Sequence, residues 1–303
     1  MQAPALEVRG LSRAFGRIAA VSELDLTVHP GDVYGFLGPN GAGKTTAIRC
    51  MLGLIRRDAG SVTFFGEDDP VRARASIGAI VETPVFYGWM SARDNLRQAA
   101  AWAGLSGKEA QSEVARVLDR VGLSGRERDR ARTYSLGMKQ RLGIARALLG
   151  HPRMLILDEP TNGLDPRGMT EMRELIRSLA RNEQITILVS SHLLSEVQQV
   201  CNRVGILSAG RLQAEGQVDE LIAASRGSFT LDLDAEDPGA LRRALDLRPD
   251  VDILEHSDGS GLRVRTETGP GQLNRELGEA GIFLTTLTPV TRNLEDVFLE
   301  VTT

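Results

Sequence analysis

A glycine-rich loop between an apolar run and a helical stretch constrains this chain most. Val33–Leu37 reads as a buried strand, and helical period begins at Thr45. Between them stands Gly-Pro-Asn-Gly-Ala-Gly-Lys-Thr-Thr, residues 38–46, which fits the spacing G-x-x-x-x-G-K-[ST]. Glycines let such a loop curl so that its N–H groups face phosphate oxygens, and the helix N-terminus adds partial positive charge. The segment therefore predicts a phosphate-binding loop on an α/β core.

The individual residues of this loop predict a bound nucleotide with Mg²⁺. Lys44 supplies a point charge for the terminal phosphates, and the hydroxyl of Thr45 suits Mg²⁺. The other residues predicted to hold the nucleotide here are Asn40, Gly41, Ala42, Gly43 and Thr46. Kinases, small GTPases, helicases and transporters all fit such a loop, so the loop alone does not select a function.

Two further strands are predicted to end at the same edge of the sheet. Met154–Leu157 is an apolar run that ends in Asp158 and Glu159. Asp158 can hold Mg²⁺ through water, while Glu159 can face an attacking water as a general base. Ile185–Val189 leads to His192 at its carboxyl end, where open α/β sheets place their ligand site. These side chains predict hydrolysis of the bound nucleotide.

A second anion-binding position is predicted about twenty residues before the acidic pair. Tyr134–Arg141 places Ser135 and Gly137, a hydroxyl and a backbone-exposing glycine, at the start of a helix. A helix capped by serine explains this local pattern equally well. After the acidic pair, Thr161–Pro166 reads as a tight turn that contains Asp165.

The order of strands and helices predicts two domains. Strands mixed with helices indicate an α/β sheet core, and Ser91–Leu149, which has helices and no strand, indicates an inserted helical subdomain. After Ile222 the order becomes strand–helix–strand–strand–helix–strand, the ferredoxin-like arrangement of a small α+β domain. We therefore predict a P-loop NTPase core over residues 1–222 and an accessory domain over 228–303, joined by a linker at 223–227.

Hydrophobic periodicity gives the expected elements of both domains. Strands are expected at Leu6–Val8, Leu24–Val28, Val33–Leu37, Val62–Phe65, Ile77–Val81, Met154–Leu157, Ile185–Val189, Val204–Leu207, Phe229–Leu233, Val251–Leu254, Leu262–Val264 and Ile282–Leu284. Helices are expected at Thr45–Ile55, Ala92–Ala103, Ala110–Val121, Met138–Leu149, Met169–Ala180, Gly239–Leu245, Gln272–Ala280 and Leu294–Val301.

Composition narrows the class of protein. The net charge of −4 offers no overall positive field for phosphates, so we expect no nucleic-acid partner. The tail is the more acidic part, with 8 basic and 15 acidic side chains from Arg226 onward. Cys50 and Cys201 stand far apart in apolar surroundings, which predicts small buried side chains in a reducing compartment. Residues 1–8 show no secretion signal and no run of about 18 apolar residues occurs, so a cytoplasmic location is expected.

Taken together, these segments resemble the ATP-binding subunits of ABC transporters over about Leu6 to Ile222. The resemblance implies an ATPase in which each motif has a family role. Residues 38–46 would be Walker A, Asp158 and Glu159 Walker B, Ser135–Lys139 the signature, Gly163–Asp165 the D-loop, His192 the switch histidine and Phe15 the aromatic that stacks on adenine. A surface-loop aromatic is the alternative for Phe15.

The resemblance also implies two protein partners. A second copy of the chain would form a head-to-tail dimer around two ATP molecules, each held by Walker A of one copy and by Ser135 and Gly137 of the other. A separate integral membrane permease would insert short helices into a groove near Glu82 to Asp94. The chain would thereby lie on the inner face of the cell membrane as a peripheral subunit.

Two positions depart from the family pattern. The signature reads Tyr-Ser-Leu-Gly-Met rather than Leu-Ser-Gly-Gly-Gln, although Ser135 and Gly137 are kept, so we still expect hydrolysis. Glu82 stands where the family normally has a glutamine that senses Mg²⁺ and the attacking water. We hypothesise that Glu82 ligates Mg²⁺ or tightens the requirement for it. The alternative is a rim residue that contacts only the membrane partner.

The sequence at residues 77–96 and 288–299 resembles one branch of this family, the ATPases of bacterial exporters for bacitracin-like peptides, lantibiotics and daunorubicin-type drugs. Sodium and polysaccharide exporters have related ATPases. DNA-maintenance and ribosome-associated relatives would need a long coiled coil or a second nucleotide domain, which this chain lacks. A regulatory sensor without hydrolysis disagrees with an intact Asp158, Glu159 and His192. The C-terminal domain is either a module for dimerisation or ligand control, or a stabilising appendage.

Overall fold

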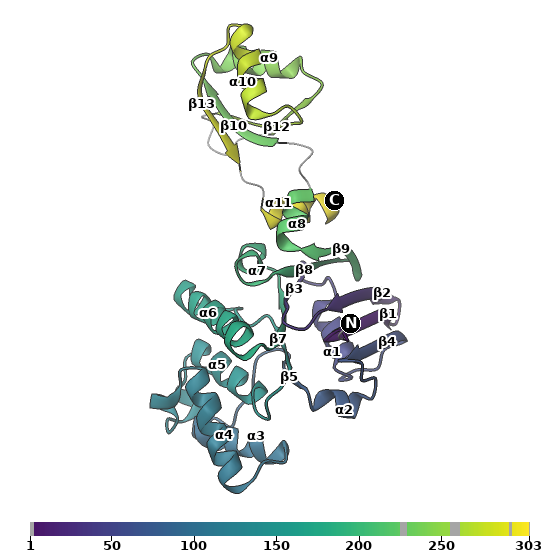
Figure 1. Cartoon of the computed structure of the whole chain (residues 1–303), viewed down its shortest axis with the longest axis vertical. Coiled ribbons are helices and arrows are strands. Elements are labelled where there is room, and N and C mark those ends of the chain that lie inside the picture. The colour runs from purple at the N-terminus through teal and green to yellow at the C-terminus, as the bar shows by residue number, and fades with distance from the viewer. Residues whose placement is uncertain (1–2, 225–228, 255–260, 291–292, 303) are drawn as a thin grey trace. The chain divides into compact units, whose positions relative to one another are not determined.

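The computed structural model describes residues 3–224, 229–254, 261–290 and 293–302, and the chain divides into two compact units (Figure 1). One unit consists of the residues up to Val218, and the other of Asp219–Val301. The sequence placed the boundary at Ile222, which lies within helix α8 (Val218–Ala224). Residues 225–227 of the predicted linker lie outside the described residues.

The first unit is built on a six-stranded sheet whose order is β5-β6-β7-β3-β8-β9. Its strands are β5 (Ile77–Ile80), β6 (Met154–Asp158), β7 (Thr186–Ser191), β3 (Val33–Leu37), β8 (Arg203–Ser208) and β9 (Arg211–Gln217). Neighbouring strands are parallel except for β8 and β9. Every residue of β3, β6 and β7 is buried, as expected of parallel strands covered on both faces. The carboxyl ends of these three strands therefore meet at one edge of the sheet.

Different layers cover the two faces of this sheet. One hydrophobic core joins the six-stranded sheet to helix α1 (Lys44–Met51) and to a second, antiparallel sheet. The strands of this second sheet are β2 (Ile18–Val28), β1 (Leu6–Phe15) and β4 (Ala59–Phe64). Helices α6 (Pro166–Glu183) and α7 (Leu194–Val200) pack against β7 and β3. A Cβ added at Gly35 of β3 would collide with Val197, so α7 lies directly on the strand.

Helices α3 (Ala92–Trp102), α4 (Gly107–Arg120) and α5 (Leu136–Ala147) form a separate lobe of the first unit (Figure 1). Two short 3₁₀ turns, Ser124–Arg126 and Ala131–Thr133, connect α4 with α5. The side chains of Ser91 and Ser135 accept backbone N–H groups at the first turns of α3 and α5. Leu96, Leu118, Leu142 and Ile144 fill the interior of the lobe.

The second unit contains a four-stranded antiparallel sheet of order β11-β12-β10-β13. In chain order its elements are β10 (Phe229–Ala235), α9 (Pro238–Asp246), β11 (Val251–Leu254), β12 (Leu262–Thr266), α10 (Pro270–Glu279) and β13 (Leu284–Val290). Apolar side chains from the sheet and both helices form a second core: Leu231, Leu233, Leu241, Leu245, Val251, Val264, Leu273 and Leu277. Helices α8 and α11 (Leu294–Thr302) complete the unit.

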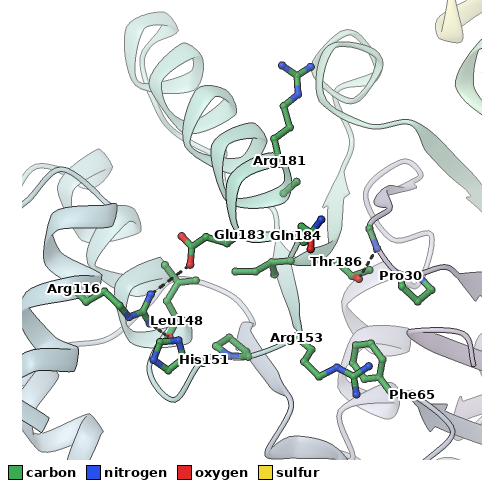
Figure 2. A pocket seen from close by; sticks show the side chains of 14 residues that line it. Pro30, Phe65, Arg116, Leu148, His151, Arg153, Arg181, Glu183, Gln184 and Thr186 are labelled. Atoms are coloured by element: carbon green, nitrogen blue, oxygen red, sulfur yellow. Dashed lines mark hydrogen bonds and ion pairs between the residues drawn. The ribbon is translucent and has the colours of Figure 1, made fainter. Parts of the chain in front are cut away.

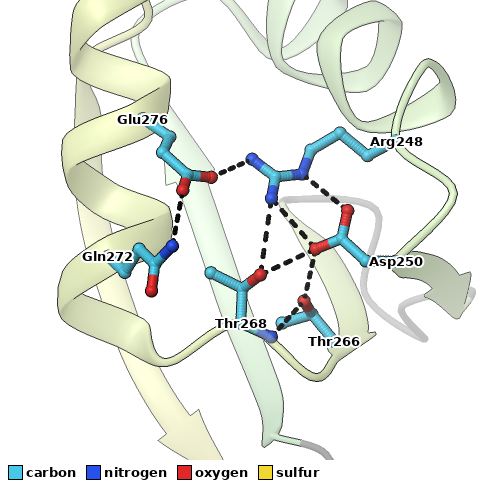
Figure 3. A network of polar contacts seen from close by, with 6 residues as sticks. All are labelled: Arg248, Asp250, Thr266, Thr268, Gln272 and Glu276. Carbon is cyan, nitrogen blue, oxygen red and sulfur yellow. Dashed lines mark hydrogen bonds and ion pairs between the residues drawn. The ribbon is translucent and has the colours of Figure 1, made fainter.

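A polar network joins α10 to the end of β12 and to Arg248 and Asp250, which precede β11 (Figure 3). The guanidinium of Arg248 donates to Asp250 at 2.9 Å and to Glu276 at 2.5 Å. The bonds from Arg248, followed by the one from the Thr268 hydroxyl, lower the pKa of Asp250 to about 2. Each carboxylate of the network therefore has a donor, and the donors from Arg248 are charged.

Most predicted elements are confirmed, and the differences have local causes. Helix α1 ends at Met51 rather than Ile55, because Gly53 adopts a φ of 65° in the left-handed region that stops helices. The last strand runs over Leu284–Val290 rather than Ile282–Leu284, and Pro289 is tolerated because β13 is an edge strand. Among the described helices and strands, four were not predicted: α2 (Pro70–Arg74), α7, α8 and β9.

Two expectations from composition can be compared with the structure. Cys50 and Cys201 are buried, as predicted; both are free thiols, and burial raises the pKa of the Cys201 thiol. None of the helices in the described ranges is long and apolar enough to cross a membrane.

Candidate nucleotide site

The glycine-rich loop lies between β3 and α1 at the carboxyl edge of the six-stranded sheet. Gly41 and Gly43 have φ angles of 84° and 102°, which L side chains rarely adopt. A Cβ at Gly43 would also collide with the Ala20 carbonyl oxygen. Lys44 opens α1 with its ammonium folded back onto the loop, where Nζ donates to the Gly38 carbonyl at 2.7 Å. The loop thus forms the curled cradle that the sequence predicts.

Three charged or ionisable side chains form a chain of contacts at this edge. Lys44 is only 6% exposed, and its Nζ lies 3.3 Å from Glu159 Oε1. Glu159 Oε2 in turn lies 2.8 Å from Nδ1 of His192, which follows β7. A buried ammonium requires such a partner, since an unpaired buried charge is costly. The contacts bring together residues separated by more than one hundred positions in the sequence.

Asp158 has donors on both of its carboxylate oxygens. Thr45 Oγ1 donates to Asp158 Oδ2 at 2.8 Å, and Ser190 Oγ donates to Asp158 Oδ1 at 2.5 Å. The carboxylate is 4% exposed, so it enters the site in one fixed orientation. Thr45 and Asp158, the two residues predicted to hold Mg²⁺ at this edge, are therefore in direct contact.

Glu159 adopts a backbone conformation that is uncommon for a residue with a side chain. Its φ is 50°, in the left-handed region. Such a conformation costs on the order of 1–3 kcal/mol and persists when surrounding contacts determine it. Here the Glu159 amide donates to the Ser190 hydroxyl at 3.0 Å and to the Ser190 carbonyl at 3.3 Å. This turn directs the Glu159 carboxylate toward Lys44 and His192.

A cavity of about 510 Å³ opens over the glycine-rich loop. It is lined by Ile18, Ala19, Ala20, Pro39, Asn40, Gly41, Ala42, Gly43, Lys44, Thr45, Thr46, Glu159, Asn162, His192, Ala209 and Gly210. The predicted residues of the loop, the base and the histidine thus share one cavity. Its walls also include Asn162, Ala209 and Gly210, which sequence reasoning missed.

Ser135, Gly137 and Asp165 line a second cavity, of about 480 Å³, between α5 and α6. The Ser135 hydroxyl accepts the Met138 amide at 3.2 Å, and Asp165 accepts the Gly168 amide at 2.9 Å. Both side chains therefore cap helices. Neither Ser135 nor Gly137 lines the first cavity, so the predicted nucleotide-binding residues are divided between two cavities.

Three further predicted site residues, Asp158, Glu82 and Phe15, are not among the residues that line the first cavity. Glu82 has a φ of 66°, a side chain that is 64% exposed, and an ion pair with Arg49 of α1. Phe15 is 49% exposed, with the Arg13 guanidinium 4.6 Å from its ring centroid. Its register partner in the β1–β2 hairpin is Ile18, which does line the cavity. Phe15 therefore lies beside the rim.

A larger cavity, of about 820 Å³, lies at the amino ends of the same parallel strands (Figure 2). Residues preceding β3, β6 and β7 line it, together with the C-terminal ends of α5 and α6. Arg116 donates to the Leu148 carbonyl at 2.9 Å and to Glu183 at 3.5 Å. Arg153 lies 3.7 Å from the centroid of the Phe65 ring. Helix C-termini carry partial negative charge, so Arg116 stabilises the end of α5, while Arg153 packs on an aromatic ring.

Comparison with known proteins agrees with this geometry. A profile of the family described as "ABC transporter" matches residues 21–162. The bacitracin transport ATP-binding protein BcrA of Bacillus licheniformis is 42% identical over 97% of this chain and 96% of its own length. The lantibiotic transport ATP-binding protein SrtF of Streptococcus pyogenes is 39% identical over 71% of this chain and 91% of its own.

Solved structures show the same architecture. CbiO1 from Clostridium perfringens, part of the ABC transporter complex CbiONQ, superposes with a TM-score of 0.68 and 27% identity, covering 73% of this chain and 92% of that one. An ATP-binding cassette of an ABC transporter in its ADP conformation gives a TM-score of 0.64 and 26% identity over 72% and 92%. The predicted resemblance and branch are confirmed, and the chain belongs to the ATP-binding subunits of ABC transporters, a family of ATPases coupled to transport, alongside relatives for bacitracin and lantibiotic transport.

Proposed function

We propose that this chain binds and hydrolyses Mg·ATP as a dimer and drives a separate membrane subunit that exports a peptide antibiotic or a related amphipathic solute. The observation that carries the proposal is the contact chain Lys44–Glu159–His192 within the cavity of the glycine-rich loop. A general base, a cation for phosphate and a residue that orients the base are the parts that hydrolysis requires.

In this proposal each side chain has one task. The loop N–H groups and the Lys44 ammonium bind the phosphates. When ATP binds, the ammonium moves partly away from the Glu159 carboxylate and contacts the terminal phosphate instead. Glu159, released toward the attacking water, accepts its proton. His192 holds the Glu159 carboxylate by the 2.8 Å contact.

Thr45 and Asp158 fit a Mg²⁺ site. The Thr45 hydroxyl donates its proton to Asp158, which leaves its lone pairs free for a cation. No group of three or more His, Cys, Asp or Glu side chains suited to a metal occurs among the described residues, so the remaining ligands would be phosphate oxygens and water. When bound, Mg²⁺ neutralises charge on the terminal phosphates. Glu82 as an additional Mg²⁺ contact stays a prediction, and its pairing with Arg49 favours the rim alternative.

A head-to-tail dimer would complete the site. Ser135, Gly137 and Asp165 line their own cavity, away from the loop of the same copy, and so are available to a nucleotide held by a second copy. Such an arrangement surrounds the terminal phosphate from both sides and excludes water on closure. Phe15 at the rim would be available for stacking on the base.

Exposed aromatic and aliphatic side chains favour a docking surface for the membrane subunit. Val85, Tyr87 and Trp89 are largely exposed between β5 and α3. They lie in the segment Glu82–Asp94 that the family resemblance assigns to the permease. Through this contact the chain would sit on the inner face of the cell membrane.

We also propose that the chain consists of an ATP-binding domain, residues 1–222, and an accessory ferredoxin-like domain, residues 228–303. Two facts support this: the β-α-β-β-α-β order and the antiparallel sheet order β11-β12-β10-β13. Its role, in dimerisation, ligand control or stability, stays open.

The relatives favour a peptide antibiotic as the exported solute, since BcrA matches 97% of this chain. A second candidate is a Nod factor or a related solute. The Nod factor export ATP-binding protein I of Burkholderia lata supports it, with 34% identity over 98% of this chain and 96% of its own length.

Co-purification tests the proposal. The tagged chain is extracted gently from membranes, its partners are identified, and ATP turnover is compared with that of Glu159→Gln. We expect an integral membrane protein to accompany the chain, with hydrolysis lost in the variant. Arrival of DNA or ribosomal proteins without a membrane protein would overturn the transport function.

A further inference from the structure

Ser190 is a buried hydroxyl at the carboxyl end of β7 that contacts both acidic residues of the site. Its exposed fraction is 0%, and its register partner on β6 is Asp158. The hydroxyl donates to Asp158 Oδ1 at 2.5 Å and accepts the Glu159 amide at 3.0 Å. One side chain therefore uses both its donor and an acceptor on two consecutive residues of the site.

The bond to Asp158 determines which of its oxygens is available. With Oδ1 occupied by Ser190, only Oδ2 faces the Thr45 hydroxyl. Without Ser190, a carboxylate that is 4% exposed would lose the donor on Oδ1 and could rotate about its terminal torsion. Ser190 thus fixes the carboxylate in the orientation that suits a cation next to Thr45.

The bond from Glu159 acts on the backbone of the general base. At a φ of 50° the Glu159 peptide needs outside contacts to persist. Both the carbonyl and the hydroxyl of Ser190 accept this amide. The hydroxyl therefore supports the turn that directs the carboxylate toward Lys44 and His192.

We propose that Ser190 is a positioning residue for hydrolysis, acting through Asp158 and Glu159 and touching neither nucleotide nor water itself. This inference rests on the proposed ATPase function. If the Ser190 hydroxyl only formed hydrogen bonds that stabilise the fold, its removal would lower stability and leave the Mg²⁺ dependence and the maximal rate unchanged. The Mg²⁺ dependence and the maximal rate therefore distinguish a positioning role from a structural one.

The chain offers a matched control on the same strand. Thr186 begins β7, is 1% exposed, and its hydroxyl accepts the Gly31 amide at 3.0 Å. That bond lies at the opposite edge of the sheet. Thr186→Val removes a buried hydroxyl of the same strand without reaching the nucleotide cavity.

The experiment measures kcat, KM for ATP and the Mg²⁺ concentration for half-maximal turnover in Ser190→Ala, Ser190→Thr and Thr186→Val, with Tm for each. For Ser190→Ala we expect kcat to fall about 10- to 100-fold and the Mg²⁺ requirement to rise, with KM for ATP unchanged within about twofold. Ser190→Thr retains the hydroxyl and restores most of kcat. Thr186→Val changes only Tm.

A binding measurement makes the test independent of turnover. Mn²⁺ titrated in the presence of ADP, followed by electron paramagnetic resonance, should bind at least about tenfold more weakly to Ser190→Ala than to wild type. If the wild type hydrolyses no ATP, the proposed function fails while this readout still tests Ser190. Should Ser190→Ala be insoluble, Ser190→Cys keeps the volume with a weaker donor. Equal Mn²⁺ affinity and equal kcat in the folded variants would overturn the inference.

Discussion

The two edges of the six-stranded sheet carry cavities of opposite character. At the carboxyl edge, about 510 Å³ is enclosed by a glycine-rich loop with buried Lys44 and a strained Glu159. At the amino edge, a cavity of about 820 Å³ is lined by Arg116, which donates to a helix-end carbonyl, and by Arg153, which packs on the Phe65 ring. In the larger cavity, Arg116 is engaged with Glu183 and with a helix-end carbonyl. Chemistry at convergent side chains, rather than volume, identifies the functional edge.

The difference follows from how the strands run. In a parallel sheet the carboxyl ends of several strands deliver loop residues to one place, and here Lys44, Glu159 and His192 follow three different strands. The amino ends receive helix C-termini, whose partial negative charge favours cations. The amino edge is therefore a place for stabilising ion pairs, such as Arg120 with Glu183 at 2.6 Å.

The largest expected effect separates the two edges by activity. Glu159→Gln removes the proposed general base and should lower ATP turnover by about 10²- to 10⁴-fold, while nucleotide binding is retained. Arg181→Ala, at the amino edge, should keep wild-type turnover. Phosphate release and binding of a fluorescent ATP analogue measure both. Equal losses in the two variants would break the comparison.

The next effect concerns stability at the amino edge. Arg116 donates to Glu113, to Glu183 and to a helix-end carbonyl, so Arg116→Ala leaves buried Glu113 without its main donor. We expect a loss of about 2 kcal/mol in the free energy of unfolding, from hydrogen bonds to a charged group. Urea unfolding followed by circular dichroism measures it, with Arg181→Ala as control. A drop in kcat of the folded variant as large as that of Glu159→Gln would contradict this assignment.

The same ion pair predicts a pH dependence. Hydrogen bonds from Arg116 are the largest cause that holds the pKa of Glu113 below its usual value of 4.5, and the Gly150 amide and His151 act in the same direction. Because the folded pKa is the lower one, the stabilisation is present above about pH 4.5 and is lost as pH falls through the folded pKa. The stability difference between wild type and Glu113→Gln should therefore shrink from pH 6 toward pH 3. A constant difference would show that the Glu113 carboxylate contributes no charge-dependent stability.

The smallest effect is that of an exposed cation–π contact. Arg153→Ala removes the guanidinium from the Phe65 ring and should cost about 0.5–1 kcal/mol of stability. Arg153→Lys should recover part of it, and turnover should stay at the wild-type level in both. Thermal unfolding with a parallel ATPase assay is sufficient. A loss of turnover in Arg153→Ala would mean that the amino edge takes part in the reaction.

Strong periodicity made most of the fold predictable. The buried strands β3, β6 and β7 are continuous apolar runs, so their place in a parallel sheet followed from the sequence. Strand β9 was missed because Arg211–Gln217 contains few apolar residues and therefore shows no strand periodicity. Its pairing with β8 becomes visible in the folded chain. The shift at β13 arose because a threonine-rich edge strand that contains Pro289 has a weak strand pattern.

Site residues that belong to a sequence motif could be predicted. Site residues whose role depends on contacts between distant parts of the chain could not. Lys44, Thr45, Asp158, Glu159 and His192 meet as their positions after strands suggested. Ser190 was missed because a serine in an apolar strand reads as a tolerated polar residue until its register with Asp158 is known. The pairing of Glu82 with Arg49 likewise depends on the folded chain.

The most direct test of the central claim is to mix two inactive variants. Lys44→Ala disables the loop half-site, and Gly137→Asp places a carboxylate where the facing phosphate would lie, in a position with room for a Cβ. In a head-to-tail dimer, one of the two sites in every mixed pair retains both intact halves, so an equimolar mixture should recover about a quarter of wild-type turnover. No recovery, with mixed pairs demonstrated by differential tags, would contradict a site built from two copies.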